Sequence, residues 1–218
     1  MRRQQIAYWH ALPRNLNLLA HLHLSHGCSP DTLTGNVMAD YLGRYEPVDQ
    51  MSESMQERLM PGIRLHREID QFTDQHSVVA RARNHISPDR RRLGGIILDI
   101  AFDYYLTRHW EKFSTEKREN TISRGYATIA MVASTGLSKK TETLISKMRM
   151  GDWLTAYGTL EGQALTFRRV SRVSPAVANL RGAEEEIVAN DSVFEQCFLE
   201  FYPDLIERAS KVLDEESA

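Results

Sequence analysis

The segment Ile96-Ile97-Leu98-Asp99-Ile100-Ala101-Phe102-Asp103-Tyr104-Tyr105-Leu106 is the most apolar part of the chain. Its apolar side chains would cover nearly every side of an α-helix, a pattern typical of a helix buried all round. Asp99 and Asp103 are four residues apart and therefore share one face of that helix. Two like charges in a low-dielectric core are unfavourable unless a cation or a proton offsets them. The segment predicts a central buried helix that carries a polar site, with pairing to arginine or backbone capping as the alternative for each Asp.

The rest of the chain is also predicted to be helical, because it has only 12 Gly and 7 Pro and few alternating β-branched runs. We expect helices at about residues 16–26, 30–42, 48–60, 61–74, 78–85, 88–110, 117–133, 141–150 and 183–213, with short or broken helices at 152–174. Pro61 either starts a helix or kinks one, and Pro203 is expected to interrupt the last helix. The prediction is a single-domain all-α helical bundle over residues 16–215.

Composition excludes several classes of protein. The chain has 218 residues, 42% hydrophobic and 26% charged, and 27 Lys and Arg against 29 Asp and Glu, which argues against disorder and against bulk binding of nucleic acid. Cys28 and Cys197 lie far apart and indicate neither a disulfide scaffold nor a zinc ribbon. No apolar run approaches the roughly 18 residues of a membrane span, and no secretory signal is evident. We therefore expect a cytoplasmic protein with no membrane or nucleic-acid partner.

A second polar stripe follows the same helical spacing. His66, Asp70 and Asp74 recur at every fourth residue, and Leu65 and Ile69 lie on the neighbouring face. Neutral imidazole together with carboxylates suits a divalent ion such as manganese or iron and argues against structural zinc. A single pair of this kind is more often a surface ion pair, so the stripe alone is weak support for a metal site.

Two further pairs repeat the spacing, again in apolar surroundings. Asn17 precedes His21 by four residues, and Asn36 precedes Asp40 by four residues. Four predicted helices thus each offer a polar pair, which is the arrangement from which helical bundles build metal sites on facing helices. The sequence therefore predicts one buried polar centre shared by these helices.

The ordered motifs resemble a known family. They are Asn17-Leu-Leu-Ala-His21-Leu-His23-Leu, Gly35-Asn36-Val-Met-Ala-Asp40, His66-Arg67-Glu-Ile-Asp70-Gln-Phe72-Thr73-Asp74, Leu98-Asp99-Ile-Ala-Phe-Asp103-Tyr-Tyr-Leu106-Thr-Arg-His109-Trp110 and Phe201-Tyr202-Pro203. Together they closely resemble the acyl carrier protein phosphodiesterases, also called acyl carrier protein hydrolases. The family is distantly similar to the HD-type phosphohydrolases, so the resemblance implies an HD-domain-like bundle.

The resemblance also implies an activity and a metal. The expected reaction is hydrolysis of the phosphodiester that joins 4′-phosphopantetheine to the serine of holo-acyl carrier protein, releasing the apo-protein and free 4′-phosphopantetheine. Manganese is the expected ion, with Mg²⁺ and Fe²⁺ as alternatives. By matching position, the implied metal ligands are Asp40, His66, Asp70 and Asp103. His21, Asp74 and Asp99 are implied as further ligands or as groups directly behind the ligands.

Catalytic roles follow as expectations from adjacency. Asp74 or Asp99 would accept a proton from the attacking water, and Arg67, next to His66, would hold a phosphate oxygen. The serine leaving group needs a proton donor, for which His21 is the first choice and His109 the second. A capping role at a helix C-terminus competes for His109.

An acidic carrier protein should dock on a basic patch even though the net charge of the chain is −2. We expect the patch in the arginines that flank the start of the central helix, namely Arg81, Arg83, Arg90, Arg91 and Arg92. A second cluster comprises Arg168, Arg169 and Arg172. A solvated charged face is the alternative for either cluster.

The sequence departs from the family pattern at two points. Leu16 stands where the family usually begins with Met, so residues 1–15 are either an extension or the result of a start site placed too early. Tyr104 stands where some relatives have His. Two other functions remain open: an HD-like phosphohydrolase for a nucleotide or other small phosphodiester, and a non-catalytic helical protein that binds carrier protein.

Overall fold

Hydroxyl side chains cap the first turns of several helices. In the computed structural model, which describes residues 17–46 and 51–217, the Ser29 hydroxyl accepts a hydrogen bond from the Thr32 amide at the start of α3. Ser52 caps α4 through the Met55 amide, and Ser138 does the same for α9. Each cap satisfies an amide that the helix itself leaves without a partner.

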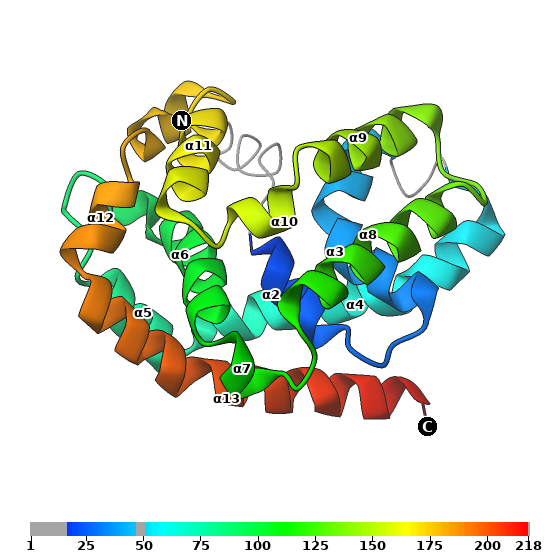
Figure 1. Ribbon diagram of the computed structural model, residues 1–218, viewed down its shortest axis with the longest axis horizontal. Coiled ribbons are helices and arrows are strands. Elements are labelled where there is room, and N and C mark those ends of the chain that lie inside the picture. The colour runs from blue at the N-terminus through cyan, green and yellow to red at the C-terminus, as the bar shows by residue number, and fades with distance from the viewer. Residues whose placement is uncertain (1–16, 47–50, 218) are drawn as a thin grey trace, which may run out of the picture.

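The described elements are helices throughout, and no strand occurs among them (Figure 1). They are α2 (Leu18–Leu24), α3 (Pro30–Tyr45), α4 (Glu53–Gln75), α5 (Ser77–Arg83), the 3₁₀ turn η2 (Arg91–Leu93), α6 (Gly94–Arg108), α7 (Trp110–Phe113), α8 (Arg118–Ala133), α9 (Lys139–Met150), α10 (Trp153–Ala156), α11 (Leu160–Val170), η3 (Pro175–Leu180), α12 (Glu184–Ala189) and α13 (Asp191–Ser217). The all-α prediction is confirmed, and none of these helices is long and apolar enough to cross a membrane. Residues 1–15, expected as an extension or an early start, lie outside the described part of the chain.

The central buried helix is confirmed as α6. Ile97, Ile100, Ala101 and Leu106 are fully buried, and α6 packs against α2, α5, α11 and α13. The helix begins at Gly94 after η2, later than the expected start at Pro88. The intervening segment is held by the buried Glu186 carboxylate, which accepts a hydrogen bond from the Ser87 amide. That long-range contact could not be read from local sequence.

Helix α2 has only 7 residues, yet it lies at the middle of the bundle against α3, α6 and α8 (Figure 1). A helix of this length is not stable alone in water, so its position depends on packing. The two oxygens of Asp103 on α6 accept hydrogen bonds from the Leu19 and Ala20 amides, both at 2.9 Å. Asp103 therefore caps the start of α2 from a different helix.

Helices α3 and α4 approach each other through two glycines. A β-carbon on Gly62 would overlap the Thr32 carbonyl oxygen and would lie 2.6 Å from the Asn36 nitrogen. A β-carbon on Gly35 would likewise overlap the Leu59 carbonyl oxygen. Only glycine permits this distance between the two backbones. The crossing places Asn36 on α3 beside the next turn of α4.

Both internal prolines lie within continuous helices. Pro61 is inside α4 and Pro203 is inside α13, so the expected interruption at Pro203 was wrong. The break falls instead at Asn190, between α12 and α13. Phe201 and Tyr202 are buried where α13 crosses α4, α5 and α6. Their packing outweighs the roughly 3 kcal/mol that an internal proline costs a helix.

Candidate metal centre

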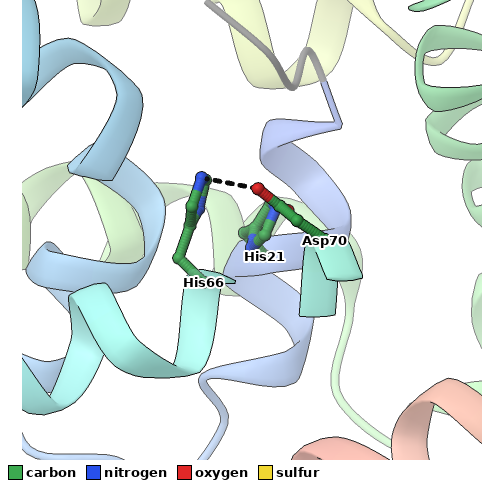
Figure 2. A group of neighbouring side chains, drawn as sticks. All are labelled: His21, His66 and Asp70. Atoms are coloured by element: carbon green, nitrogen blue, oxygen red, sulfur yellow. Dashed lines mark ion pairs between the residues drawn. The ribbon is translucent and has the colours of Figure 1, made fainter. Parts of the chain in front are cut away.

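Three side chains from two helices converge at the core (Figure 2). His21 comes from α2, and His66 and Asp70 come from successive turns of α4. His66 Nε2 lies 3.2 Å from one Asp70 oxygen, and His21 Nε2 lies 3.4 Å from the other. The two imidazoles stack with their centroids 4.3 Å apart. The helical spacing of His66 and Asp70 therefore becomes a site only when α2 adds His21.

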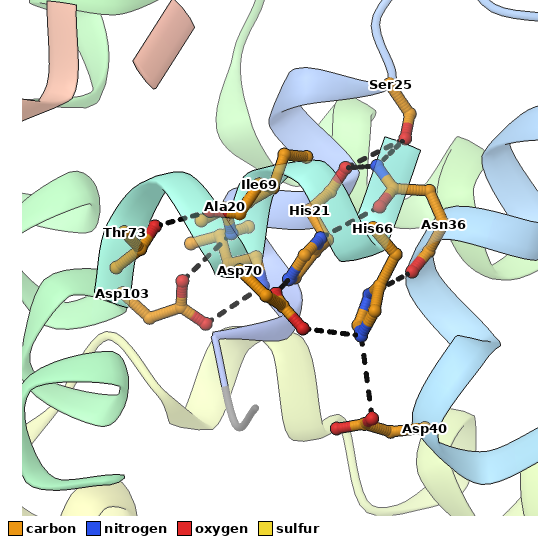
Figure 3. Close-up of polar contacts among 11 residues, drawn as sticks. Ala20, His21, Ser25, Asn36, Asp40, His66, Ile69, Asp70, Thr73 and Asp103 are labelled. Carbon is orange, nitrogen blue, oxygen red and sulfur yellow. Dashed lines mark hydrogen bonds and ion pairs between the residues drawn. The ribbon is translucent and has the colours of Figure 1, made fainter. Parts of the chain in front are cut away.

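The opposite ring nitrogens are both held by Asn36 on α3 (Figure 3). His21 Nδ1 lies 2.8 Å from the Asn36 side-chain oxygen. His66 Nδ1 lies 2.8 Å from the Asn36 main-chain oxygen. Each ring is therefore oriented by a bond on the side away from Asp70.

This arrangement fits a divalent cation. His21 Nε2, His66 Nε2 and Asp70 Oδ1 are all buried and lack a hydrogen-bond partner among the described residues. Ligand atoms of the three residues lie within 4.8 Å of one another. Buried polar atoms are costly unless paired, and imidazole and carboxylate are ligands that divalent ions accept. The donor set is compatible with a divalent metal, and further ligands would have to complete its coordination.

Asp40 on α3 adds a second carboxylate to the cluster. Its carboxylate lies 3.5 Å from His66 Nε2. Burial lowers the pKa of His66, but the carboxylates of Asp40 and Asp70 outweigh burial and raise that pKa overall. The same carboxylates that raise this pKa would also attract a metal ion.

Asp103, implied by the resemblance as a ligand, is not part of this group of converging atoms. Both of its oxygens accept hydrogen bonds from the start of α2, and it is fully buried. Burial raises the pKa of Asp103 to about 8, although the amides of Leu19 and Ala20 lower it. Its observed contacts support the helix that carries His21.

Asp99 is the second carboxylate of α6 and is nine-tenths buried. Burial raises the pKa of Asp99 well above its usual range, and the charges of Asp70, Asp74 and Asp103 raise it further against Arg83. It therefore lies within electrostatic reach of the cluster without being one of the three converging ligands.

The other residues with expected catalytic roles lie outside the three-residue cluster. Asp74 is exposed and pairs with Arg83 at 3.4 Å. His109 pairs with Glu195 of α13 at 2.7 Å, beyond the end of α6. Arg67 is exposed on α4 next to His66. The structure thus brings together His21, His66, Asp70 and Asp40, while Asp74 and His109 make pairs elsewhere.

Several of the arginines expected to form the docking patch are engaged within the molecule. Arg81 forms an ion pair with Glu200, and Arg83 forms one with Asp74. Arg90 lies 3.3 Å from buried Glu186 and also donates hydrogen bonds to the main-chain carbonyls of Asn179 and Arg181. Arg91 reaches the carbonyls of Asn84 and Ile86, and Arg92 is exposed.

Sequence reasoning did not identify Ser25, and it noted Asn36 only as a member of a polar pair. Ser25 lies one turn after His21, is buried, and donates a hydrogen bond to the His21 carbonyl at 2.8 Å. The available signal was its spacing of four residues from His21. Asn36 was identifiable as a polar residue in an apolar stretch, but its contacts depend on how α3 crosses α4.

Comparison with known proteins identifies the family. The model of the family "Acyl carrier protein phosphodiesterase" matches residues 16–205. The chain belongs to this family. Acyl carrier protein phosphodiesterases from Pectobacterium atrosepticum and Photorhabdus laumondii are 32% and 31% identical to it. In both cases the match covers 89% of this chain, and it covers 97% and 95% of the respective relatives.

An acyl carrier protein phosphodiesterase from Escherichia coli is 29% identical over 90% of this chain and 98% of that relative. No solved structure matches the chain. The family match includes all four residues of the polar cluster, from His21 to Asp70. The buried centre therefore lies within the part of the chain shared with the phosphodiesterase family.

Proposed function

We propose that this protein hydrolyses the phosphodiester between 4′-phosphopantetheine and the serine of holo-acyl carrier protein in a manganese-dependent reaction. Family membership supports the substrate. The observation that supports a metal-dependent mechanism is the convergence of His21 Nε2, His66 Nε2 and Asp70 Oδ1, three buried atoms that have no hydrogen-bond partner in the described part of the chain. A divalent ion bound there would neutralise phosphate oxygens and lower the pKa of water.

We assign His21, His66 and Asp70 as metal ligands, with Asp40 as the nearest additional carboxylate. The distances within this group support the assignment. Asp103 is assigned to hold α2 in place, because both of its oxygens accept backbone amides. This differs from the role that the resemblance implies for Asp103.

Asp99 is assigned as the proton acceptor of the reaction. Burial and the neighbouring carboxylates raise the pKa of Asp99, and a carboxylate with a raised pKa is a stronger proton acceptor than an exposed Asp. Arg67, exposed beside His66, is assigned to a phosphate oxygen. His21 faces Asp70, which supports ligation over proton donation to the leaving serine. His109 is paired with Glu195, and we give it no role.

We place the protein in the cytoplasm. Cys28 and Cys197 are both free thiols, which fits a reducing compartment.

The deciding experiment follows the intact mass of holo-acyl carrier protein incubated with purified enzyme, with and without Mn²⁺. We expect loss of the 4′-phosphopantetheine mass only with metal, and no loss with Asp70→Ala. The control is Gln71→Ala, which alters an exposed residue next to Asp70 on α4 and should leave hydrolysis intact. Equal hydrolysis by the Asp70→Ala variant would contradict the proposed site.

The same preparation separates the alternative functions. Turnover of a small phosphodiester without turnover of carrier protein would favour an HD-like phosphohydrolase. A non-catalytic binding protein would show no hydrolysis and no rise in Tm with Mn²⁺. Binding to the native state at 100 times Kd stabilises a protein by about 2.7 kcal/mol, so the site predicts a rise in Tm.

A further inference from the structure

We propose that Asn36 is the positioning residue of the metal site, because it fixes both imidazoles with hydrogen on Nδ1 and an unprotonated Nε2 toward Asp70. This inference rests on the metal site proposed above. Asn36 is fully buried and contacts both histidines, with its side chain on His21 and its main chain on His66 (Figure 3).

The orientation of the Asn36 amide follows from its own partners. One of its terminal atoms lies 3.1 Å from the His21 carbonyl and 2.8 Å from the Ser25 hydroxyl oxygen. A carbonyl only accepts, and the Ser25 hydroxyl uses its hydrogen on that same His21 carbonyl. The atom facing them must therefore be the amide nitrogen, which donates to both. The amide oxygen is left facing His21 Nδ1.

The tautomers of both rings follow. The Asn36 amide oxygen only accepts, so His21 Nδ1 must carry a hydrogen. The main-chain oxygen of Asn36 imposes the same requirement on His66 Nδ1. In a neutral imidazole, a hydrogen on Nδ1 leaves Nε2 with a lone pair, which is the form that binds a metal. Asn36 thus holds both imidazoles in the tautomer that can bind a metal.

Without the Asn36 side chain, His21 is free to carry its hydrogen on Nε2. That hydrogen would point at Asp70, 3.4 Å away, and the two ligands would form a hydrogen bond with each other. The imidazole would no longer offer a lone pair to a cation. The Asn36 side chain therefore prevents a hydrogen bond between the ligands His21 and Asp70. It acts on His21 alone, because His66 is held by the Asn36 main chain.

The test uses the full-length, metal-free protein with ¹⁵N-labelled histidine, and two-bond ¹H–¹⁵N spectra that distinguish the tautomers of neutral rings. We expect the Nδ1–H form for both His21 and His66 in the wild type. In Asn36→Leu, His21 should gain Nε2–H while His66 keeps Nδ1–H, because its partner is the main-chain oxygen. Asn36→Asp keeps the acceptor toward His21 Nδ1 but loses the donor to the His21 carbonyl, so it should recover the Nδ1–H form of His21 in part.

Mn²⁺ titrations of the same proteins give a second readout. We expect Asn36→Leu to weaken Mn²⁺ binding by about 10- to 100-fold, as loss of such supporting contacts does elsewhere, with partial recovery in Asn36→Asp. The matched control is Thr34→Val, which removes a buried hydroxyl of α3 that bonds to the Pro30 carbonyl and not to either imidazole. It should keep both tautomers and wild-type affinity.

An Nε2–H tautomer of His21 in the wild type would overturn the proposal. So would a folded Asn36→Leu variant with unchanged tautomers and unchanged Mn²⁺ affinity. If Asn36→Leu does not fold, Asn36→Ala removes the same acceptor of His21 Nδ1 with a smaller side chain, and an unchanged His21 tautomer with unchanged Mn²⁺ affinity there would also overturn the proposal. Failure to hydrolyse carrier protein with the tautomers as expected would refute the proposed function and leave the positioning role intact.

Discussion

Asp103 is a buried carboxyl group that also caps α2, and its raised pKa gives stability a pH dependence. Its pKa is about 8 in the folded protein and about 4 in an unfolded chain. A raised carboxyl pKa stabilises the native state fully below the unfolded pKa, and that stabilisation is lost as the pH rises toward the folded pKa. The contribution of Asp103 should therefore fall between about pH 4 and pH 8, by at most about 1.4 kcal/mol per pH unit.

The variant Asp103→Asn tests this at constant size. Its amide nitrogen would face one of the two α2 amides, so one hydrogen bond is lost at a cost of about 1–3 kcal/mol. We expect the variant to be less stable than the wild type at pH 5, with a smaller loss of stability between pH 5 and pH 8. Urea unfolding across this range measures both quantities. Exposed Asp214→Asn is the control and should keep the wild-type slope.

At the scale of elements, the crossing of α3 and α4 decides whether the site forms. Gly62→Ala would gain about 1 kcal/mol of helix propensity. Its β-carbon would overlap the Thr32 carbonyl oxygen and crowd the Asn36 nitrogen, and these backbone atoms cannot rotate away. We expect net destabilisation of about 2 kcal/mol, together with weaker Mn²⁺ binding as His66 separates from Asn36. Thermal unfolding and Mn²⁺ titration provide the measurements.

The same substitution at Gly95 of α6 is a control for which we expect the opposite change in stability. A β-carbon there would lie 3.5 Å from the Arg83 side chain and 4.0 Å from Asp74, which are ordinary contacts. We therefore expect Gly95→Ala to raise stability by about 0.5–1 kcal/mol. A stabilised Gly62→Ala would show that α3 and α4 do not need this close approach.

At the scale of the whole molecule, docking of an acidic carrier protein must use charge that is not already neutralised. Arg81, Arg83 and Arg90 form ion pairs within the protein, which leaves Arg91 and Arg92 as the exposed members of the predicted patch without such pairs among the described residues. Reversal of Arg90 would remove the cationic partner of buried Glu186 and would test stability more than docking.

We predict that Arg91→Glu with Arg92→Glu raises KM for carrier protein several-fold at low salt and leaves kcat nearly unchanged, because exposed charges mainly affect association. The effect should shrink at high ionic strength. Steady-state kinetics at two salt concentrations checks it. Arg168→Glu with Arg169→Glu tests the second cluster in parallel, and an unchanged KM in both variants would remove both surfaces from the docking face.

Local patterns were sufficient for much of the fold. The apolar run from Ile96 to Leu106 predicted the buried helix α6, and the helix expected at about residues 30–42 is α3. The spacing of His66 and Asp70 placed both on one face of α4. Proline was misleading at Pro203, because the penalty it imposes is local whereas the packing that opposes it comes from other helices.

The sequence by itself therefore determined the all-α class, the buried helix, the family resemblance and the residue types of a metal site, because helical periodicity and caps depend on neighbours within a few residues. Only the tertiary structure decided which partner each of these residues contacts. Asp103 holds the amides of α2, Asn36 holds two imidazoles, and Arg90 holds Glu186. Each of these pairs joins separate helices or segments, so it depends on crossing angle and helix rotation, which no local spacing specifies.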